Sequence, residues 1–263
     1  MTRDGRSVSR PAPLVRSIAA LGGMELRLAL RRGENLLVML VIPIAVLAFF
    51  ANLGIGPLGT GPRAVAALLP GTMALAIIAT SLVNLGIATA YERSYGVLKR
   101  LGGGPIPRWS IVAAKIATVL VIEVVQLILL AATALAVLGW LPPASTDLVR
   151  RATLLVTGLG LGTLAFAGLG LLMAGRLRAE ATLALANGLF LGFLMLGGVV
   201  LPLDHLPEPL ATIGSFLPSS ALADVLKAAL AESAGGELLR PLVVLAAWGI
   251  GATVAAARTF RWE

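Results

Sequence analysis

The sequence predicts an all-α integral membrane protein with six membrane-spanning helices. Of its 263 residues, 58% are hydrophobic and only 13% are charged, whereas soluble domains carry about 25% charged residues. Six charge-poor stretches are close to the length of about 20 residues that a helix needs to cross a bilayer. They are Leu36–Ile55, Ala64–Tyr91, Ile116–Leu141, Ala152–Gly175, Ala181–Leu203 and Pro241–Ala257. Their long runs of Leu, Ala, Val and Gly favour helices, because strands of a membrane barrel alternate in polarity.

The distribution of basic residues predicts how these spans are oriented. If the N-terminus is cytoplasmic, 16 Lys and Arg residues lie on the inside and 5 on the outside, as the positive-inside rule requires. The net charge of +8 is therefore a topology signal that also attracts anionic lipid headgroups, and we expect no nucleic-acid partner. The Ala-, Gly-, Arg- and Leu-rich composition is typical of a GC-rich bacterium. We expect a multi-pass protein of the bacterial cytoplasmic (inner) membrane with both termini in the cytoplasm.

The chain before the first span divides into two parts. Residues 1–13 are rich in Arg, Ser, Pro and Gly, which predicts a disordered cytoplasmic tail. Residues 14–263 form a single transmembrane domain. In residues 14–32, apolar and basic positions alternate at helical spacing, which indicates a helix lying in the cytoplasmic interface. Its candidate interface residues are Arg16, Glu25, Arg27 and Arg31.

The most informative segment follows the second span. Residues 91–101 combine charges with Val97, Leu98 and Leu101 at helical spacing. This pattern predicts a short amphipathic helix that is exposed to the cytoplasm and serves as a docking element. The simpler alternative is that its cations only anchor a membrane hairpin, which leaves Glu92 and the apolar face without a role. The candidate docking residues are Glu92, Arg93, Gly96, Val97, Leu98, Lys99, Arg100 and Leu101.

A few strongly polar residues interrupt the spans. Glu123 is the one charged residue within them, and a carboxylate that faces lipid at mid-depth costs about 2.5–3.5 kcal/mol. It therefore belongs to a polar pathway or a helix–helix hydrogen bond, or else it snorkels to the cytoplasmic side. Gln126, three residues on, shares its helix face. With Asn84 and Asn187, these residues are the candidates for an intramembrane polar pathway.

Glycine and proline punctuate the second half of the chain. Gly158 and Gly162 in the fourth span are four residues apart, which predicts a flat face for close helix packing. In the loop 204–240, the sequence predicts two short apolar helices, Leu210–Leu217 and Ala221–Ala231, that dip back toward the membrane and cover the outer mouth. The candidate outer-gate residues are Pro202, Asp204, Pro207, Pro218 and Asp224.

Several kinds of chemistry have no motif in this sequence. It lacks the Walker A pattern, H-E-x-x-H and G-x-S-x-G, and has one histidine and no cysteine. We therefore expect no catalytic residue, no metal site and no cofactor bound by this chain. Three rival interpretations remain. An ion-driven secondary transporter needs buried ionisable pairs, of which only Glu123 is a candidate. An intramembrane enzyme needs clustered catalytic groups, and a scaffold subunit leaves the docking segment without a use.

Three passages together resemble the membrane subunits of ABC-2-type exporters, the permeases of bacterial drug and polysaccharide export. Residues 91–101 with Pro105–Trp109 are similar to the family stretch E-R-E-x-G-T-L-x-R-L-x-x-T-P-x-x-R. Residues 197–207 are similar to G-x-x-x-P-x-x-x-L-P, and residues 217–226 to an L-P run followed by D-x-L. The departures are Ser94-Tyr95, where a second acidic residue is common, and the Gly102–Gly104 linker.

The resemblance implies a role for each of these segments. Residues 91–101 would be a coupling helix that contacts a separate P-loop ATPase subunit, which holds the ATP and Mg. Residues 14–32 would be the connecting helix beside that subunit, and 204–240 the outer re-entrant helices. A second six-span permease subunit, identical or similar, would complete the transporter. The substrate would be amphipathic: a drug, a lipid or a lipid-linked glycan moved out of the cytoplasm or inner leaflet.

Overall fold

The computed structural model describes residues 14–31, 33–53, 59–103, 107–142, 147–199, 203, 206–231 and 237–261. Within these ranges the chain forms helices joined by turns, without a strand. The helices are α1 (Leu14–Arg31), α2 (Gly33–Leu53), α3 (Pro62–Ile78), η1 (Ala79–Asn84), α4 (Leu85–Ser94), α5 (Val97–Gly102), α6 (Arg108–Ala136), α7 (Leu148–Arg176), α8 (Ala179–Leu196), α9 (Glu208–Ser215), α10 (Pro218–Leu230) and α11 (Leu239–Thr259). The predicted all-α class is confirmed. The tail 1–13 lies outside the described residues.

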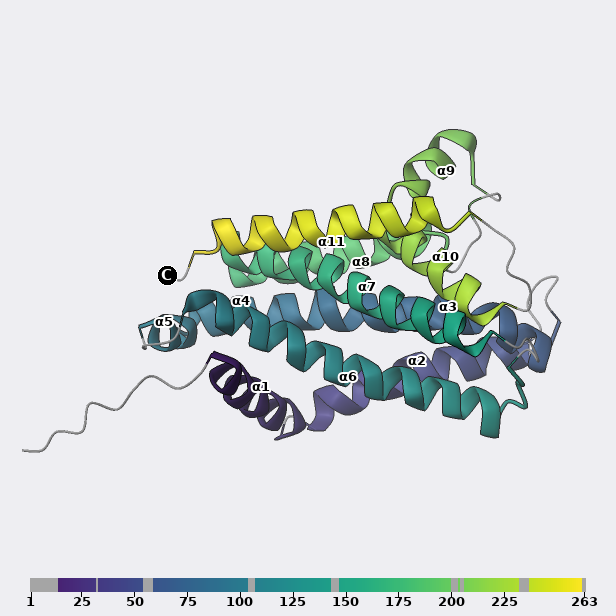
Figure 1. Cartoon of the computed structure of the whole chain (residues 1–263), viewed down its shortest axis with the longest axis horizontal. Helices are drawn as coiled ribbons and strands as arrows, with labels where there is room; N and C mark the ends of the chain where they lie inside the picture. Colours follow the sequence, from purple (N-terminus) through teal and green to yellow (C-terminus); the bar gives the residue numbers. More distant parts are fainter. Residues whose placement is uncertain are drawn as a thin grey trace, which may run out of the picture.

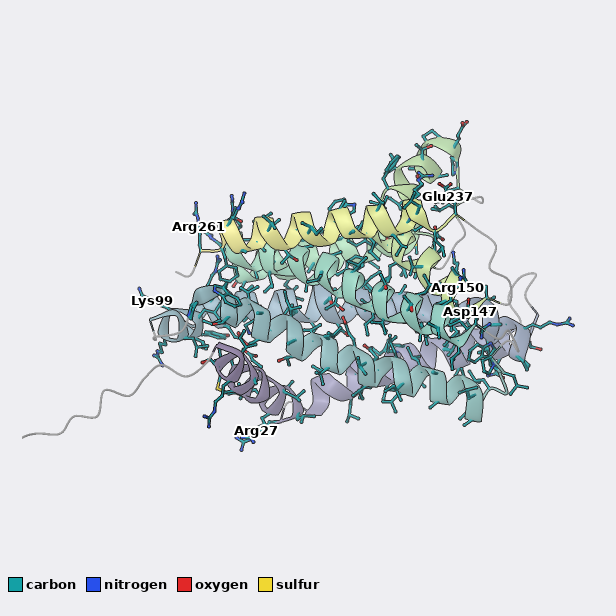
Figure 2. All side chains as sticks on the ribbon, in the orientation of Figure 1. Arg27, Lys99, Asp147, Arg150, Glu237 and Arg261 are labelled. Carbon is teal, nitrogen blue, oxygen red and sulfur yellow. The ribbon has the colours of Figure 1, made fainter. Side chains whose placement is uncertain are left out.

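The long helices lie side by side in one elongated bundle (Figure 1). α1, α5 and the C-terminal end of α11 lie at one end of the bundle, here called the α5 end, while α9 lies at the other, the α9 end. Arg27, Lys99 and Arg261 mark the α5 end, and Asp147, Arg150 and Glu237 mark the α9 end (Figure 2). The segments that the sequence assigns to the cytoplasm thus gather at one end.

In the described part of the chain, five helical stretches are long and apolar enough to cross a membrane: Pro62–Ser94, Trp109–Ala136, Leu148–Arg176, Ala179–Leu196 and Leu239–Thr259. α9 and α10 meet at an angle of 76° and count as one further broken span or as a re-entrant loop. The apolar part of α2, Leu37–Leu53, is shorter than these five. The chain is therefore a multi-pass membrane protein by the length and composition of its helices, and the count of six spans stays a prediction.

The second predicted span forms a single rod of 33 residues, Pro62–Ser94. The helix continues through Pro70, so its regular hydrogen bonding does not change there. That change comes at η1, a π-helical segment in the middle of the rod. Such π-bulges occur frequently at functional sites. η1 therefore marks the part of the rod to inspect for function.

Two predicted spans end earlier than expected. α6 ends at Ala136 instead of Leu141, and α8 ends at Leu196 instead of Leu203. In both places a glycine with positive φ follows, Gly139 at 66° and Gly198 at 62°, a conformation that other residues rarely adopt. Apolar composition continues past these turns, so hydropathy alone set the predicted ends too far along the chain.

The glycines of α7 pack against three different neighbours. A Cβ atom on Gly158 would lie 3.0 Å from Val225 Cγ1, and one on Gly162 would lie 3.0 Å from Leu222 Cδ1. These two glycines therefore let α10 approach closely, which confirms the predicted packing face. On other faces of α7, Gly168 packs against the backbone of α11, and Gly170 packs against η1 and Gly86.

We predict that Gly168→Ala destabilises the bundle, whereas Gly160→Ala does not. A Cβ atom on Gly168 would lie 2.7 Å from the Thr253 backbone nitrogen, whereas one on Gly160 would meet nothing within 4 Å. The first change should lower the free energy of unfolding by about 1–3 kcal/mol through overpacking. The second should raise it by up to about 1 kcal/mol, because alanine favours helix. Thermal unfolding in detergent measures both, and equal midpoints would contradict the α7–α11 contact.

Candidate coupling end and intramembrane groove

Residues 91–101 do not form one helix. α4 continues to Ser94, the chain turns at Tyr95–Gly96, and α5 begins at Val97. Gly96 adopts a left-handed conformation with φ 70°, which costs glycine little and other residues more. The predicted amphipathic helix is therefore corrected to a helix end, a glycine turn and a separate short helix.

The exposed surface of this segment also differs from the prediction. Leu98 is fully buried, while Tyr95 and Val97 are 72% and 41% exposed. Lys99 and Arg100 are exposed and Leu101 is half-buried. Leu98 is corrected to an internal packing residue. The surface available to a partner is formed by Tyr95, Val97, Lys99 and Arg100.

Glu92 belongs to a charged triad that the sequence did not reveal. The triad consists of Glu25 on α1, Glu92 on α4 and Lys115 on α6. Lys115 Nζ lies 2.9 Å from Glu25 Oε1 and 2.6 Å from Glu92 Oε2. The Lys115 side chain is 4% exposed, and the two carboxylates are 17% and 19% exposed. One buried ammonium thus joins α1, α4 and α6.

The Arg93 guanidinium also makes a hydrogen bond within the chain. Its Nη2 donates to the carbonyl of Leu177, at the end of α7. Glu92 and Arg93 were both predicted to contact an ATPase subunit. In the structure their charged groups bind within this chain, and their contact with an ATPase subunit stays a prediction. A sequence signal for the triad existed. Lys115 directly precedes the apolar run of the third span, and Glu92 is the one acidic residue between Tyr91 and Lys115.

α1 has one exposed side, which mixes basic and apolar side chains, and one side that packs within the bundle. Arg16, Arg27 and Arg31 are exposed, and Met24, Leu28 and Leu30 are exposed apolar side chains of the same helix. Its other side packs on α6, where the Thr118 hydroxyl lies 3.3 Å from the Gly22 carbonyl oxygen. Glu25, the fourth predicted interface residue, points to the triad. The location of α1 in a membrane interface stays a prediction.

Glu123 lies in the interior of the bundle and is fully buried. The hydroxyls of Ser81 on η1 and Thr163 on α7 donate to its two carboxylate oxygens. These three residues, here called the polar cluster, join three elements by side-chain hydrogen bonds. Of the alternatives that the sequence left open, snorkelling to the cytoplasmic side is wrong, and helix–helix hydrogen bonding is what the structure shows. Neither Ser81 nor Thr163 was singled out from the sequence.

Gln126 makes a second polar link one turn further along α6. The Thr80 hydroxyl lies 3.1 Å from Gln126 Oε1, and Gln126 Nε2 donates to the Met39 carbonyl over 2.7 Å. The link ties η1 to α6 and α2. The hydroxyls of Thr80 and Ser81 both come from the π-helical segment.

A groove with a volume of about 660 Å³ opens between α2, the α3–α4 rod and α8. Asn84 and Asn187 line it, together with Thr80. Glu123 and Gln126 are buried on α6 and do not line it. The four predicted pathway residues therefore separate into two that line a groove and two that connect helices.

The α9 end holds the described part of the predicted outer gate. Pro207 precedes α9 and Pro218 begins α10. Asp224 on α10 lies 3.6 Å from Lys227 Nζ, which also donates to the Gly198 carbonyl after α8. The bent helix pair is thus connected to the end of α8. Pro202 and Asp204 lie outside the described residues.

These features define a class of protein: a multi-pass helical membrane protein with a short exposed helix at one end, a broken helix pair at the other and a lateral groove between them. The family model described as ABC-2 type transporter matches residues 16–230. The chain therefore belongs to the ABC-2 type transporter family. A protein of Bacillus subtilis (strain 168) named "Putative transport permease YvfS" is 25% identical over 197 residues, which are 74% of this chain and 78% of that protein.

Proposed function

We propose that this chain is the permease subunit of an ATP-driven exporter in a bacterial cytoplasmic membrane, with both termini in the cytoplasm. Its family implies a partnership with an ABC ATPase, and that separate subunit would hold the ATP and Mg. The observation that carries the proposal is α5, a short helix at the cation-rich end of the bundle with Val97, Lys99 and Arg100 exposed. The exported substrate would be amphipathic.

The connection between α5 and the rod supports a coupling role. α5 is separated from α4 only by Tyr95 and Gly96, and the same rod carries η1 and one wall of the groove. A displacement of α5 by the ATPase subunit would therefore move a groove wall directly. The ATPase subunit can drive such a change only by contacting the two states of the permease differently.

The groove supports an amphipathic substrate and a second permease subunit. Its walls combine apolar side chains such as Ile42 and Phe190 with the amides of Asn84 and Asn187. It opens laterally on the face that carries α2 and α8, where Phe49, Leu185 and Leu191 are 60%, 44% and 57% exposed. A second copy or a similar chain on this face would close the groove into a shared cavity.

Co-purification tests the proposal and gives its first prediction. We compare the wild-type chain with the double variant Val97→Glu/Arg100→Glu, purified from native membranes in mild detergent. The wild type should retain a P-loop ATPase subunit, identified by mass spectrometry and by ATP hydrolysis. The variant should retain it at least about tenfold less, because central contact residues cost more than 1 kcal/mol when removed.

The matched control is Arg63→Glu/Val149→Glu, which makes the same two replacements on exposed residues at the other end of the molecule. It should retain the ATPase subunit as the wild type does. Purification of an intact wild-type chain without any ATPase would contradict the proposal and favour the ion-driven transporter. Equal retention by both variants would place the contact elsewhere than α5.

A further inference from the structure

We infer that the groove selects positively charged amphipathic molecules, which Glu92, Tyr91 and Tyr95 recognise at its α5 end. This inference rests on the proposed function and specifies the substrate class of the same groove. It follows from the charges of the groove, from its aromatic side chains and from its size.

The charge on the described lining of the groove is negative, although the α5 end as a whole is rich in cations. Glu92 is the one charged residue among the described residues that line it. Within the triad, Lys115 faces two carboxylates, Glu92 and Glu25, which leaves one uncompensated negative charge. Arg93, the adjacent cation, donates to the Leu177 carbonyl and does not line the groove. Charge of one sign between low-dielectric walls concentrates ligands of the opposite sign.

Two aromatic rings lie beside this charge. The ring centroids of Tyr91 and Tyr95 are 6.1 Å apart with an angle of 33° between the planes, and both residues line the groove. Aromatic faces attract cations within about 6 Å, and a cation that is desolvated gains most. A carboxylate with two tyrosine rings is thus suited to a diffuse, weakly hydrated cation. Lys115 already occupies Glu92 Oε2, so a bound cation would share this carboxylate with the Lys115 ammonium.

The remainder of the groove suits the apolar part of such a molecule. Its volume of about 660 Å³ lies in the range of about 300–1,000 Å³ that is typical of small-molecule sites. Ile42 and Phe190 provide apolar walls, and Asn84 and Asn187 lie among them. A bound cation would contact Glu92, and through it the triad that connects α1, α4 and α6. Occupation of the groove would thus change the surroundings of Glu92, which lies in the last turn of α4 before α5.

A pair of ions with the same shape and opposite charge tests the inference. Tetraphenylphosphonium and tetraphenylborate are offered to the purified full-length chain in uncharged detergent, and binding is measured by equilibrium dialysis. Tetraphenylphosphonium should bind saturably, and tetraphenylborate at least about tenfold more weakly. Glu92→Gln should weaken tetraphenylphosphonium binding by about tenfold. Tyr95→Leu, at an exposed position that does not threaten folding, should weaken it by about threefold.

Two further variants separate a direct contact from a general charge effect. Glu25→Gln removes the same charge from the triad but no groove-lining atom, so it should weaken binding less than Glu92→Gln. Glu208→Gln, at an exposed position of the α9 end, should leave binding unchanged. Thermal unfolding of each variant serves as the control for correct folding.

The inference is wrong if tetraphenylborate binds as tightly as tetraphenylphosphonium, if neither ion binds, or if Tyr95→Leu and Glu92→Gln both leave binding unchanged. The co-purification experiment does not depend on these ions. An ATPase subunit that co-purifies with a chain that does not discriminate between them would therefore leave the exporter proposal intact while refuting the charge selection.

Discussion

Lys115→Met is expected to lower the free energy of unfolding by about 3 kcal/mol, because removing one partner of a buried ion pair leaves an uncompensated charge. Lys115 is 4% exposed and holds both Glu25 and Glu92. Without the ammonium, two carboxylates from α1 and α4 would face each other at the edge of the bundle. Thermal or denaturant unfolding of the purified chain in detergent measures the loss.

A second lysine provides the control. Lys227 also pairs with a carboxylate, Asp224, but both side chains are more than 40% exposed at 43% and 48%. Lys227→Met should therefore cost only about 0–1 kcal/mol. The triple variant Lys115→Met/Glu25→Gln/Glu92→Gln should recover most of the stability lost by Lys115→Met, because it leaves no charge unpaired. Similar losses for the two single lysine variants would contradict the role given to burial.

The triad also predicts that Lys115→Met weakens the contact between α1 and α6. The chain has no cysteine, so the pair Gly22→Cys/Thr118→Cys reports the contact between α1 and α6 without background. A Cβ atom on Gly22 would lie 3.7 Å from Thr118 Oγ1, which is close enough for a disulfide to form. The cross-link should form efficiently with Lys115 present and poorly with Lys115→Met. Unchanged cross-linking would show that α1 is held by its apolar contacts alone.

Glu123→Ala is expected to lower the free energy of unfolding by about 2–4 kcal/mol. It removes the acceptor of the Ser81 hydroxyl and one of the two acceptors of the Thr163 hydroxyl, and a buried polar group without a partner costs about 1–3 kcal/mol. It also leaves a cavity between α6, α7 and η1. Because η1 lies in the rod that carries α5 and a groove wall, transport in membranes should fall together with the unfolding midpoint.

Glu123→Gln distinguishes hydrogen bonding from charge. Thr163 Oγ1 has one hydrogen, and the Leu159 carbonyl at 2.7 Å is a second acceptor for it. A glutamine amide can accept from Ser81 and donate to Thr163, which then donates to Leu159. This variant should therefore stay within about 1 kcal/mol of the wild type and retain transport. Loss of transport at wild-type stability would instead assign Glu123 an ionic role and revive the ion-driven alternative.

The apolar framework of the fold was predictable because hydropathy is a local property. The apolar runs gave the long helices, and Gly158 and Gly162 gave a packing face that α10 occupies. The ends of the helices were less accurate. Gly139 and Gly198 terminate them through backbone conformation, while the apolar composition runs on past these turns.

The sequence predicted which segment forms the candidate site better than it predicted the orientation of the side chains in that segment. Residues 91–101 were predicted to be a docking segment, which stays a prediction, and the family match supports an ABC ATPase partner. Which side chains of the segment face outward was not predictable. The single helix assumed through the segment is broken at Gly96, and in the separate helix α5 Leu98 is buried while Val97 is exposed.

The sequence by itself indicated that this protein lies in a membrane, that it is helical and to which family it belongs. These properties follow from composition, from the spacing of apolar residues and from short motifs, which are all read along the chain. Only the tertiary structure decided which polar groups meet. Lys115 pairs with Glu25, which is 90 positions away in the sequence, and with Glu92, which is 23 positions away. Ser81 and Thr163 donate hydrogen bonds to Glu123 from different helices. These partners depend on the rotation and register of packed helices, which are set by contacts between segments distant in the chain and leave no local pattern.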